Sequence, residues 1–326
     1  MTSQLLGLRR PVALAAIGAG LAYGLLARFV FGHDAAEGLL DGVMTCSFIF
    51  VVPFVIGFVA AYVHPGDGLG MRRAVVLAWA AGTLTIFFAM GLAWEGLICA
   101  VVWLPVFLLM AALGGLNAWG LRRASGGRRP LVLASFAIAP FVVAPLEAQL
   151  PTPNRIRVVE NRIEIAADAA TVWTQIREVP PIAPEELGPS FAHRIGFPRP
   201  IEARLVGEGV GSVRYATFEG GVTFVEMVTE WEEGRALAFT IDARAVPATT
   251  FDQHVAVGGP YFDVLEGRYR IEQAGPGRCV LYLSSRHRLS TRFNAYTRIW
   301  TALFMRDIQQ NILEVIRRRS ERTAAA

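Results

Sequence analysis

Five long apolar segments fill the first half of the chain, and they constrain the fold more than any other feature. Each is about 20 residues long, the length at which a helix crosses a hydrocarbon core of about 30 Å. We therefore predict a transmembrane helical domain of about five spans over residues 1–150. The segments are Pro11 to Phe31, Val43 to Val63, Ala74 to Trp94, Gly96 to Trp119, and Leu131 to Leu150.

The first segment resembles a signal peptide, and Arg9 with Arg10 resembles a twin-arginine signal. We discount both interpretations. The apolar run is long, no small-residue cleavage site ends it cleanly, and four further apolar segments follow it.

Charged residues between the segments predict the topology. Arginines precede the first segment and follow the second and the fourth, whereas acidic residues fill the loop after the first, and Glu95 alone marks the turn after the third. The positive-inside rule then places the N-terminus in the cytoplasm and residues after 150 outside the cytoplasmic membrane. Because ionisable groups are nearly absent from the segment interiors, an anchoring bundle is favoured over the alternative of a transport pathway.

Composition excludes several classes of function. The chain contains no lysine, so all 31 basic residues are arginine, which excludes lysine Schiff-base chemistry and a P-loop. The net charge of +4 is small and no basic block occurs, so we expect no nucleic-acid binding. Cys46, Cys99 and Cys279 lie in apolar or strand patterns without zinc spacing, so we expect neither a metal nor a cofactor.

The second half begins after a short proline-containing linker at residues 151–154. Asn161 to Ile165 alternates like a half-buried strand, and Asp168 is a plausible N-cap for a helix that carries Val172 and Trp173. From Thr291 onward, apolar residues at helical spacing predict a long amphipathic helix that needs a large partner such as a curved sheet. The strands expected between them are Ile201 to Val206, Gly211 to Phe218, Val222 to Trp231, Ala236 to Ala243, Tyr261 to Ile271, and Cys279 to Leu289.

This half resembles the START-like superfamily (SRPBCC), also called the polyketide cyclase/dehydrase and lipid-transport group. The resemblance rests on the opening strand–helix run, on Gly209 to Tyr215, on Glu226 to Arg235, and on the last helix. It covers roughly residues 155–320, leaves 321–326 as a tail, and implies an α+β helix-grip domain. In that fold a curved antiparallel sheet wraps a long C-terminal helix and leaves a hydrophobic cavity. Members bind lipids, sterols or polyketides, and some cyclise or dehydrate them, but the resemblance transfers no catalytic residue.

Polar and aromatic residues of this domain are candidates for the cavity. If Glu272 and Arg278 close the last hairpin, Asp263 lies opposite His287 on its apolar face, and the two form a polar anchor for the ligand. A register two residues different would place Leu265 opposite His287, and a hydrogen-bonded core histidine is a further alternative. The full set of predicted ligand-binding residues is Asp263, His287, Tyr269, Glu226, His254, Tyr296, Trp300, Leu303 and Phe304.

Two of these predictions depend on orientation. Glu226 lies between Phe224 and Val228 on one face of its strand, and alternation alone leaves an inward or an outward face open. In the last helix, we expect the stripe that contains Trp300 and Leu303 to face the sheet and line the cavity.

We therefore expect a membrane-anchored domain that binds a hydrophobic or lipid-like ligand, with the bilayer as its second partner. An enzyme of the cyclase or dehydratase type is one alternative, with Asp, Glu and His as acids and bases. The other is a sensor or assembly module without a ligand. The sequence identifies no catalytic residue and no protein partner.

Overall fold

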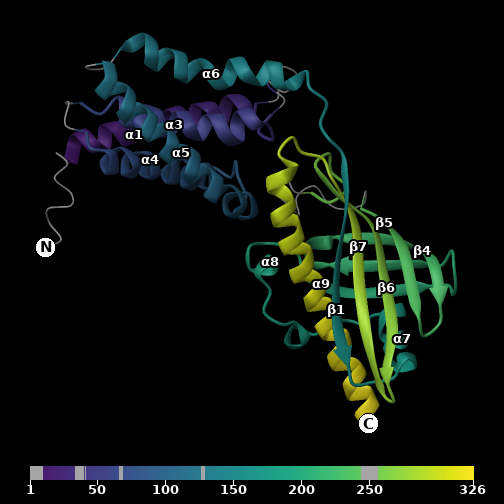
Figure 1. The fold of residues 1–326 in the computed structure, drawn as a ribbon. Helices are drawn as coiled ribbons and strands as arrows, with labels where there is room; N and C mark the ends of the chain where they lie inside the picture. The colour runs from purple at the N-terminus through teal and green to yellow at the C-terminus, as the bar shows by residue number, and fades with distance from the viewer. Residues whose placement is uncertain (1–9, 34–39, 41, 66–68, 126–128, 244–255) are drawn as a thin grey trace, which may run out of the picture. The chain divides into compact units, whose positions relative to one another are not determined.

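A computed structural model describes residues 10–33, 40, 42–65, 69–125, 129–243 and 256–326 (Figure 1). The chain divides into two compact units, Met1–Thr152 and Pro153–Ala326. We call them the helical unit and the sheet unit, and we describe each by itself.

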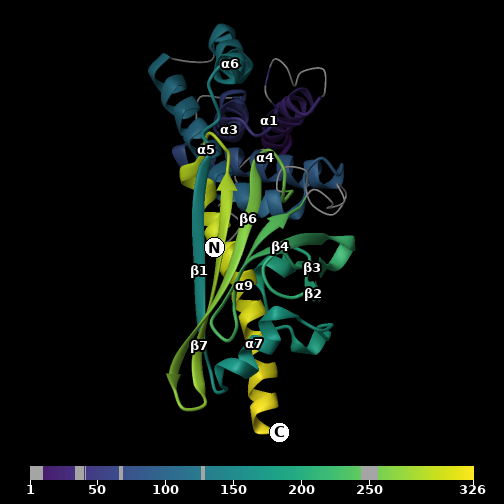
Figure 2. The same ribbon diagram turned by 90° about the vertical axis from the view of Figure 1, so that its right-hand side faces the viewer.

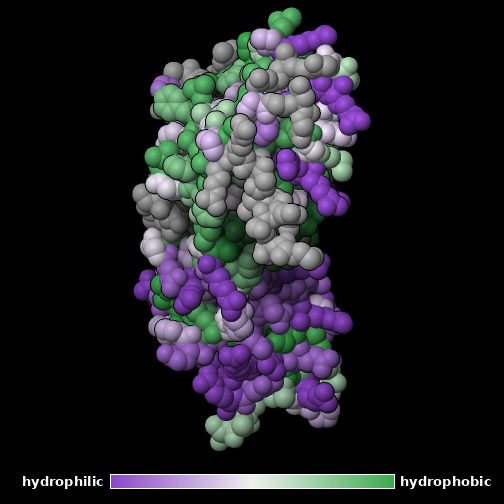
Figure 3. All heavy atoms as spheres, turned by 90° about the vertical axis from the view of Figure 1, so that its left-hand side faces the viewer, coloured by the Kyte–Doolittle hydropathy of each residue, from purple (hydrophilic) through white to green (hydrophobic). Residues whose placement is uncertain are grey.

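Apolar helices make up the helical unit. Among the described residues, four of them are long and apolar enough to cross a membrane, and they correspond to the first, third, fourth and fifth predicted spans. Figure 3 shows apolar side chains, in green, gathered over these helices on the face in view. The helices are α1 (Arg10–Phe31), η2 (Ser47–Val51, a π-helix), α3 (Val52–Tyr62), α4 (Met71–Gly91), α5 (Leu97–Ser125) and α6 (Pro130–Ala148).

The second predicted span is the exception, because its helix runs only from Ser47 to Tyr62 and is shorter than the other four. The carboxylate of Glu147 on α6 lies at the start of this helix. It accepts hydrogen bonds from the backbone N of Cys46 (2.5 Å), the backbone N of Ser47 (2.8 Å) and Ser47 Oγ (2.8 Å). A carboxylate at a helix N-terminus satisfies free backbone donors, so a residue 100 positions away caps this helix together with Thr45, whose Oγ1 accepts from Phe48 N at 3.1 Å.

Glycine permits close contact between α3 and α5. A Cβ atom on Gly57 would overlap the carbonyl oxygen of Ala111, and one on Gly114 would overlap the carbonyl oxygen of Phe54. Small residues at such a crossing let two backbones touch, which is how membrane helices gain packing energy without a hydrophobic driving force.

The sheet unit begins with a long strand, β1, followed by three short helical segments. Six more strands and a final long helix follow (Figures 1 and 2). The elements are β1 (Arg155–Ile165), α7 (Ala169–Arg177), η3 (Pro184–Glu186), α8 (Phe191–Arg194), β2 (Pro200–Val206), β3 (Val213–Phe218), η4 (Glu219–Gly221), β4 (Thr223–Glu232), β5 (Ala236–Asp242), β6 (Phe262–Gly275), β7 (Arg278–Leu289) and α9 (Asn294–Ala325).

Within the described residues, seven strands form one antiparallel sheet in the order β1-β7-β6-β5-β4-β3-β2. Figure 2 shows this sheet curving around α9, so the predicted helix-grip fold is confirmed. The predicted N-cap is also confirmed, because Asp168 accepts a hydrogen bond from Thr171 N at 2.7 Å. Helix α9 continues to Ala325, so the residues predicted as a tail from 321 are helical.

Helix α9 packs against β1, β7, α7 and α8. Gln309 Nε2 joins it to the sheet by donating to the Val159 carbonyl (3.1 Å) and to Ser285 Oγ (2.9 Å). Near its C-terminus, Arg319 and Arg322 both donate to the carboxylate of Glu186 on η3. These bonds, led by the one from Arg319, hold the pKa of Glu186 at about 2.

Candidate functional site

The concave face of the sheet holds a buried ion pair. Arg214 on β3 and Glu226 on β4 are directly opposite each other, and Arg214 Nη1 lies 2.5 Å from Glu226 Oε2. Their exposed fractions are only 3% and 5%. The next buried position on β4 is Val228, which belongs to the apolar core, so the structure places Glu226 on the inner face.

Aromatic rings surround this pair. The Arg214 guanidinium carbon lies 5.1 Å from the ring centroid of Phe239 on β5 and 5.9 Å from that of Tyr269 on β6. The Phe239 ring lies over Gly267, where a Cβ atom would overlap it. We call Arg214, Glu226 and Tyr269 the buried polar cluster. Sequence analysis selected Glu226 and Tyr269 as separate candidates, and the structure brings them together through Arg214.

Burial dominates the electrostatics of the cluster. It raises the pKa of the Glu226 carboxyl, and the neighbouring Arg214 opposes that rise. Burial also raises the pKa of Tyr269. Among the described residues, Arg214 Nε has no hydrogen-bond partner. A buried donor without an acceptor costs about 1–3 kcal/mol, so the cluster presents one donor that an acceptor oxygen would satisfy.

The predicted anchor of Asp263 and His287 is wrong in its pairing. Val264 lies opposite His287, and Asp263 lies opposite Arg288. The hairpin closes at Gly275 and Arg278, and a second irregularity between Val264 and Glu266 shifts the register again. The observed closing pair is three residues later on β6 than the predicted pair of Glu272 and Arg278. The two β-bulges, each of which adds an unpaired residue to β6, offset only two of those three residues, so Asp263 misses His287 by one position.

The two residues accordingly have different surroundings. His287 is fully buried on the inner face, and its ring centroid lies 5.7 Å from that of Phe262. Burial lowers the pKa of His287, and the charge of Arg157 on β1 lowers it further, against a backbone hydrogen bond at Ser285. Burial raises the pKa of Asp263, and Arg288 opposes that rise.

We expect His287 to be neutral at pH 7 and to titrate below 6.5, its ordinary value. Its contribution to stability is then present above pH 6.5 and is lost as the pH falls toward the lower folded pKa, because the unfolded chain takes up the proton first. Histidine NMR titration of the full chain in detergent measures this, in the parent and in Asp263→Asn. A midpoint above 6.5, or one that moves in the variant, would contradict the geometry.

Only part of the predicted stripe of α9 faces the sheet. Phe304 is buried, Tyr296 and Trp300 are half-buried, and Leu303 is 46% exposed. Gln309 faces the sheet, and residues six positions apart on a helix lie roughly 120° apart around its axis, so Leu303 points elsewhere. The predicted inward orientation is wrong for Leu303. His254 lies outside the described residues.

Trp300 and Leu303 instead line a shallow, open hollow of about 670 Å³ on the surface between β1, α8 and α9. Phe191 of α8 forms another apolar part of its wall. The ring of Trp300 packs on that of Phe304, with centroids 5.7 Å apart. The polar part of the wall comes from Asn161, Arg306, Asp307 and Gln310.

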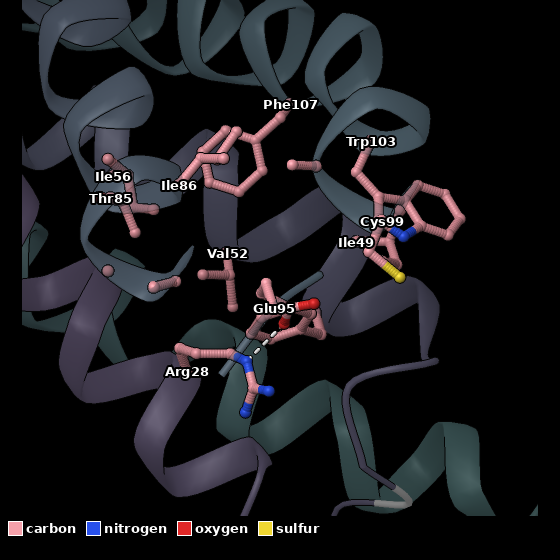
Figure 4. A pocket seen from close by; sticks show the side chains of 14 residues that line it. Arg28, Ile49, Val52, Ile56, Thr85, Ile86, Glu95, Cys99, Trp103 and Phe107 are labelled. Atoms are coloured by element: carbon pink, nitrogen blue, oxygen red, sulfur yellow. Dashed lines mark hydrogen bonds and ion pairs between the residues drawn. The ribbon is translucent and has the colours of Figure 1, made fainter. Parts of the chain in front are cut away.

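The helical unit contains a second pocket, shown in Figure 4, between α1, η2–α3, α4 and α5. Arg28 closes one end by donating to Glu95 Oε1 (2.5 Å) and to the Trp94 carbonyl (2.5 Å). Arg28 lies near the end of the first predicted span, and its partner Glu95 is 67 residues away along the chain. The space is small, about 50 Å³, and its charged pair is satisfied internally, so it suits a short apolar group at most.

Among the described residues, no group of three or more His, Cys, Asp or Glu side chains is placed to hold a metal ion.

The order of strands and helices identifies the architecture of the second unit. It has the helix-grip fold.

No family model and no curated protein sequence matches the chain. Among solved structures, norcoclaurine synthase from Thalictrum flavum is similar at 17% identity over 51% of this chain and 86% of that chain, with a TM-score of 0.32. The Zhui aromatase/cyclase from a Streptomyces species is similar at 17% identity over 52% and 98% of the chains, with a TM-score of 0.34. A protein from Nitrosospira multiformis is similar at 17% identity over 52% and 100%, with a TM-score of 0.32.

Proposed function

We propose that the protein is a membrane-anchored START-like domain that binds a hydrophobic, lipid-like ligand on the concave face of its sheet. The observation that supports this most is the buried polar cluster, in which Arg214 Nε is left without an acceptor inside an apolar core. In this proposal, Arg214 orients a carbonyl, carboxylate or similar oxygen of the ligand.

The purely structural alternative is that the Arg214–Glu226 pair only holds β3 against β4. A buried ion pair is weak support for stability, because well-packed apolar residues of similar size often replace it without loss. Ligand pockets, in contrast, are mostly apolar and contain a few polar groups that fix orientation. The buried polar cluster matches this description, because its few polar groups lie within an apolar core.

Membrane placement supports the same function. A ligand with little solubility in water needs to travel only a short distance from a bilayer to a tethered domain. We propose that the apolar helices anchor the chain in the cytoplasmic membrane and that the sheet unit lies outside the cytoplasm, which the alternation of arginines between the helices supports.

Native mass spectrometry of the full chain in a mild detergent tests the proposal. We expect the parent to retain a hydrophobic molecule of defined mass and the double variant Arg214→Met/Glu226→Leu to lose most of it. The matched control is Arg268→Met/Glu230→Leu, which removes the same residue types from an ion pair with far more exposed side chains in the same sheet (2.6 Å). The control is expected to retain the molecule.

Hydrogen exchange on each variant checks that the fold is kept, so that loss of the ligand can be distinguished from unfolding. Equal retention in the two double variants would reject Arg214 as the orienting residue. A parent that carries no such molecule would reject ligand binding and favour the sensor or assembly module.

The convergence of Glu226 and Tyr269 supports a second candidate, a cyclase or dehydratase. A carboxyl group whose pKa is raised by burial is suited to act as a general acid. The same measurement separates the two functions through Tyr269→Phe, which keeps the ring but removes the hydroxyl. A bound molecule heavier by one water in the variant than in the parent favours dehydration, and an unchanged mass rejects it.

A further inference from the structure

The start of α9 lies beside the linker that leaves the helical unit. Asn294 Nδ2 donates to the Pro153 carbonyl at 2.9 Å, and Ser290 Oγ bonds to Asn154. Only five residues, Gln149 to Pro153, separate the end of α6 from Asn154. Each step along the chain spans at most about 3.6 Å, so the six steps from Ala148 to Asn154 reach at most about 22 Å.

Apolar side chains are exposed at this end of α9. Tyr296, Ile299, Trp300 and Leu303 follow the spacing of one helical face, and Ile299 is 61% exposed while Leu303 is 46% exposed. A contiguous apolar stripe on a soluble surface marks a contact surface. Tryptophan and tyrosine in such a stripe are typical of the boundary between lipid headgroups and acyl chains.

The chain around the stripe is positively charged. From Arg288 to Arg306 the chain contains four arginines and no acidic residue, and Arg298 and Arg306 on α9 are exposed. Arg155 and Arg157 add exposed charge on β1. The first acidic residue of α9, Asp307, is bonded to Ser190 Oγ (2.5 Å) and Ala192 N (2.9 Å).

We infer that the face of α9 formed by Tyr296, Ile299, Trp300 and Leu303, with Arg306 beside it three residues after Leu303, rests on an anionic phospholipid bilayer. An amphipathic helix that combines tryptophan and leucine with arginine binds such a surface through apolar burial and charge attraction together. This inference depends on the membrane anchoring proposed above, and it commits to the bilayer because the short linker and the arginines both favour it over a protein partner.

Photo-crosslinking of the full chain in nanodiscs tests it. Benzoylphenylalanine replaces Leu303, and in the control it replaces Met227, an apolar residue of β4 that is 54% exposed. We expect lipid adducts at position 303 and few at position 227. The adducts at 303 are expected to increase when phosphatidylglycerol is added to phosphatidylcholine.

Charge reversal supplies the second measurement. Arg306→Glu is expected to lower the lipid adduct at position 303 several-fold in the anionic nanodisc, because each basic residue beside an anionic surface strengthens membrane binding several-fold. Hydrogen exchange verifies the fold of each variant.

Crosslinks from position 303 only to protein, whether a second copy or another part of the chain, would overturn the inference, as would equal lipid adducts at 303 and 227. Extraction of the membranes at high pH tests the anchoring separately from the docking surface. A protein that stays in the membrane at high pH but gives no lipid adduct at 303 rejects the docking surface alone, whereas a protein released at high pH rejects the anchoring.

Discussion

Replacing Glu226 with alanine is expected to lower the free energy of unfolding of the sheet unit by about 3–5 kcal/mol, the cost of leaving one partner of a buried ion pair uncompensated. Arg214 is only 3% exposed, so solvent cannot replace the lost carboxylate. Hydrogen exchange of the full chain in detergent, followed on peptides from β3 and β4, measures the change.

Two controls make this result specific. Glu230→Ala removes the carboxylate of the Arg268 pair, whose side chains are 47% and 28% exposed, and should cost about 0–1 kcal/mol. Arg214→Met/Glu226→Leu should recover most of the stability, because neither charge then remains in the core. A loss below about 1 kcal/mol in Glu226→Ala would mean that water or another group reaches Arg214.

The largest effect in the helical unit is expected for Gly114→Ala. The added Cβ would overlap the carbonyl oxygen of Phe54, which is backbone and cannot rotate away, so α3 and α5 must separate along their contact. Overpacking typically costs 1–3 kcal/mol, and we expect about 3 kcal/mol or more here because two backbones meet. Faster thiol labelling of the buried Cys99 during heating reports this loss.

Gly120→Ala on the same helix is the matched control. Among the described residues, no atom lies within 4 Å of a Cβ at that position, and alanine favours a helix over glycine. Cys279 in the sheet unit serves as the internal reference, since its labelling should be the same in both variants. If Gly114→Ala left the labelling of Cys99 unchanged, the close crossing of α3 and α5 would be wrong.

Local patterns were sufficient for most of the architecture. The positions of the long helices, the N-cap at Asp168 and the order of strands and helices all depend on residues near one another in the chain. Hydrophobic period and capping chemistry act over one or two turns, so a single sequence carries them. One contact at the start of the second span was not local, because Glu147 on a distant helix accepts from Ser47 N there.

Register and rotation were decided by contacts between distant segments. The β6–β7 hairpin closes three residues later on β6 than predicted, and its two irregularities offset only two of those residues, so Asp263 lies opposite Arg288. Packing of Gln309 on β1 and β7 turned Leu303 outward. The inward face of Glu226 followed from its position opposite Arg214, which alternation alone could not assign.

The sequence by itself therefore determined which elements form and in what order, since hydrophobic periodicity, capping residues and segment length are local properties. Only the tertiary structure decided which polar side chains meet. A bulge shifts a strand by one residue and a small rotation of a helix changes its buried face, and neither leaves a signature in the pattern that a single sequence presents. For that reason Arg214, Glu226 and Tyr269 became one cluster only in three dimensions.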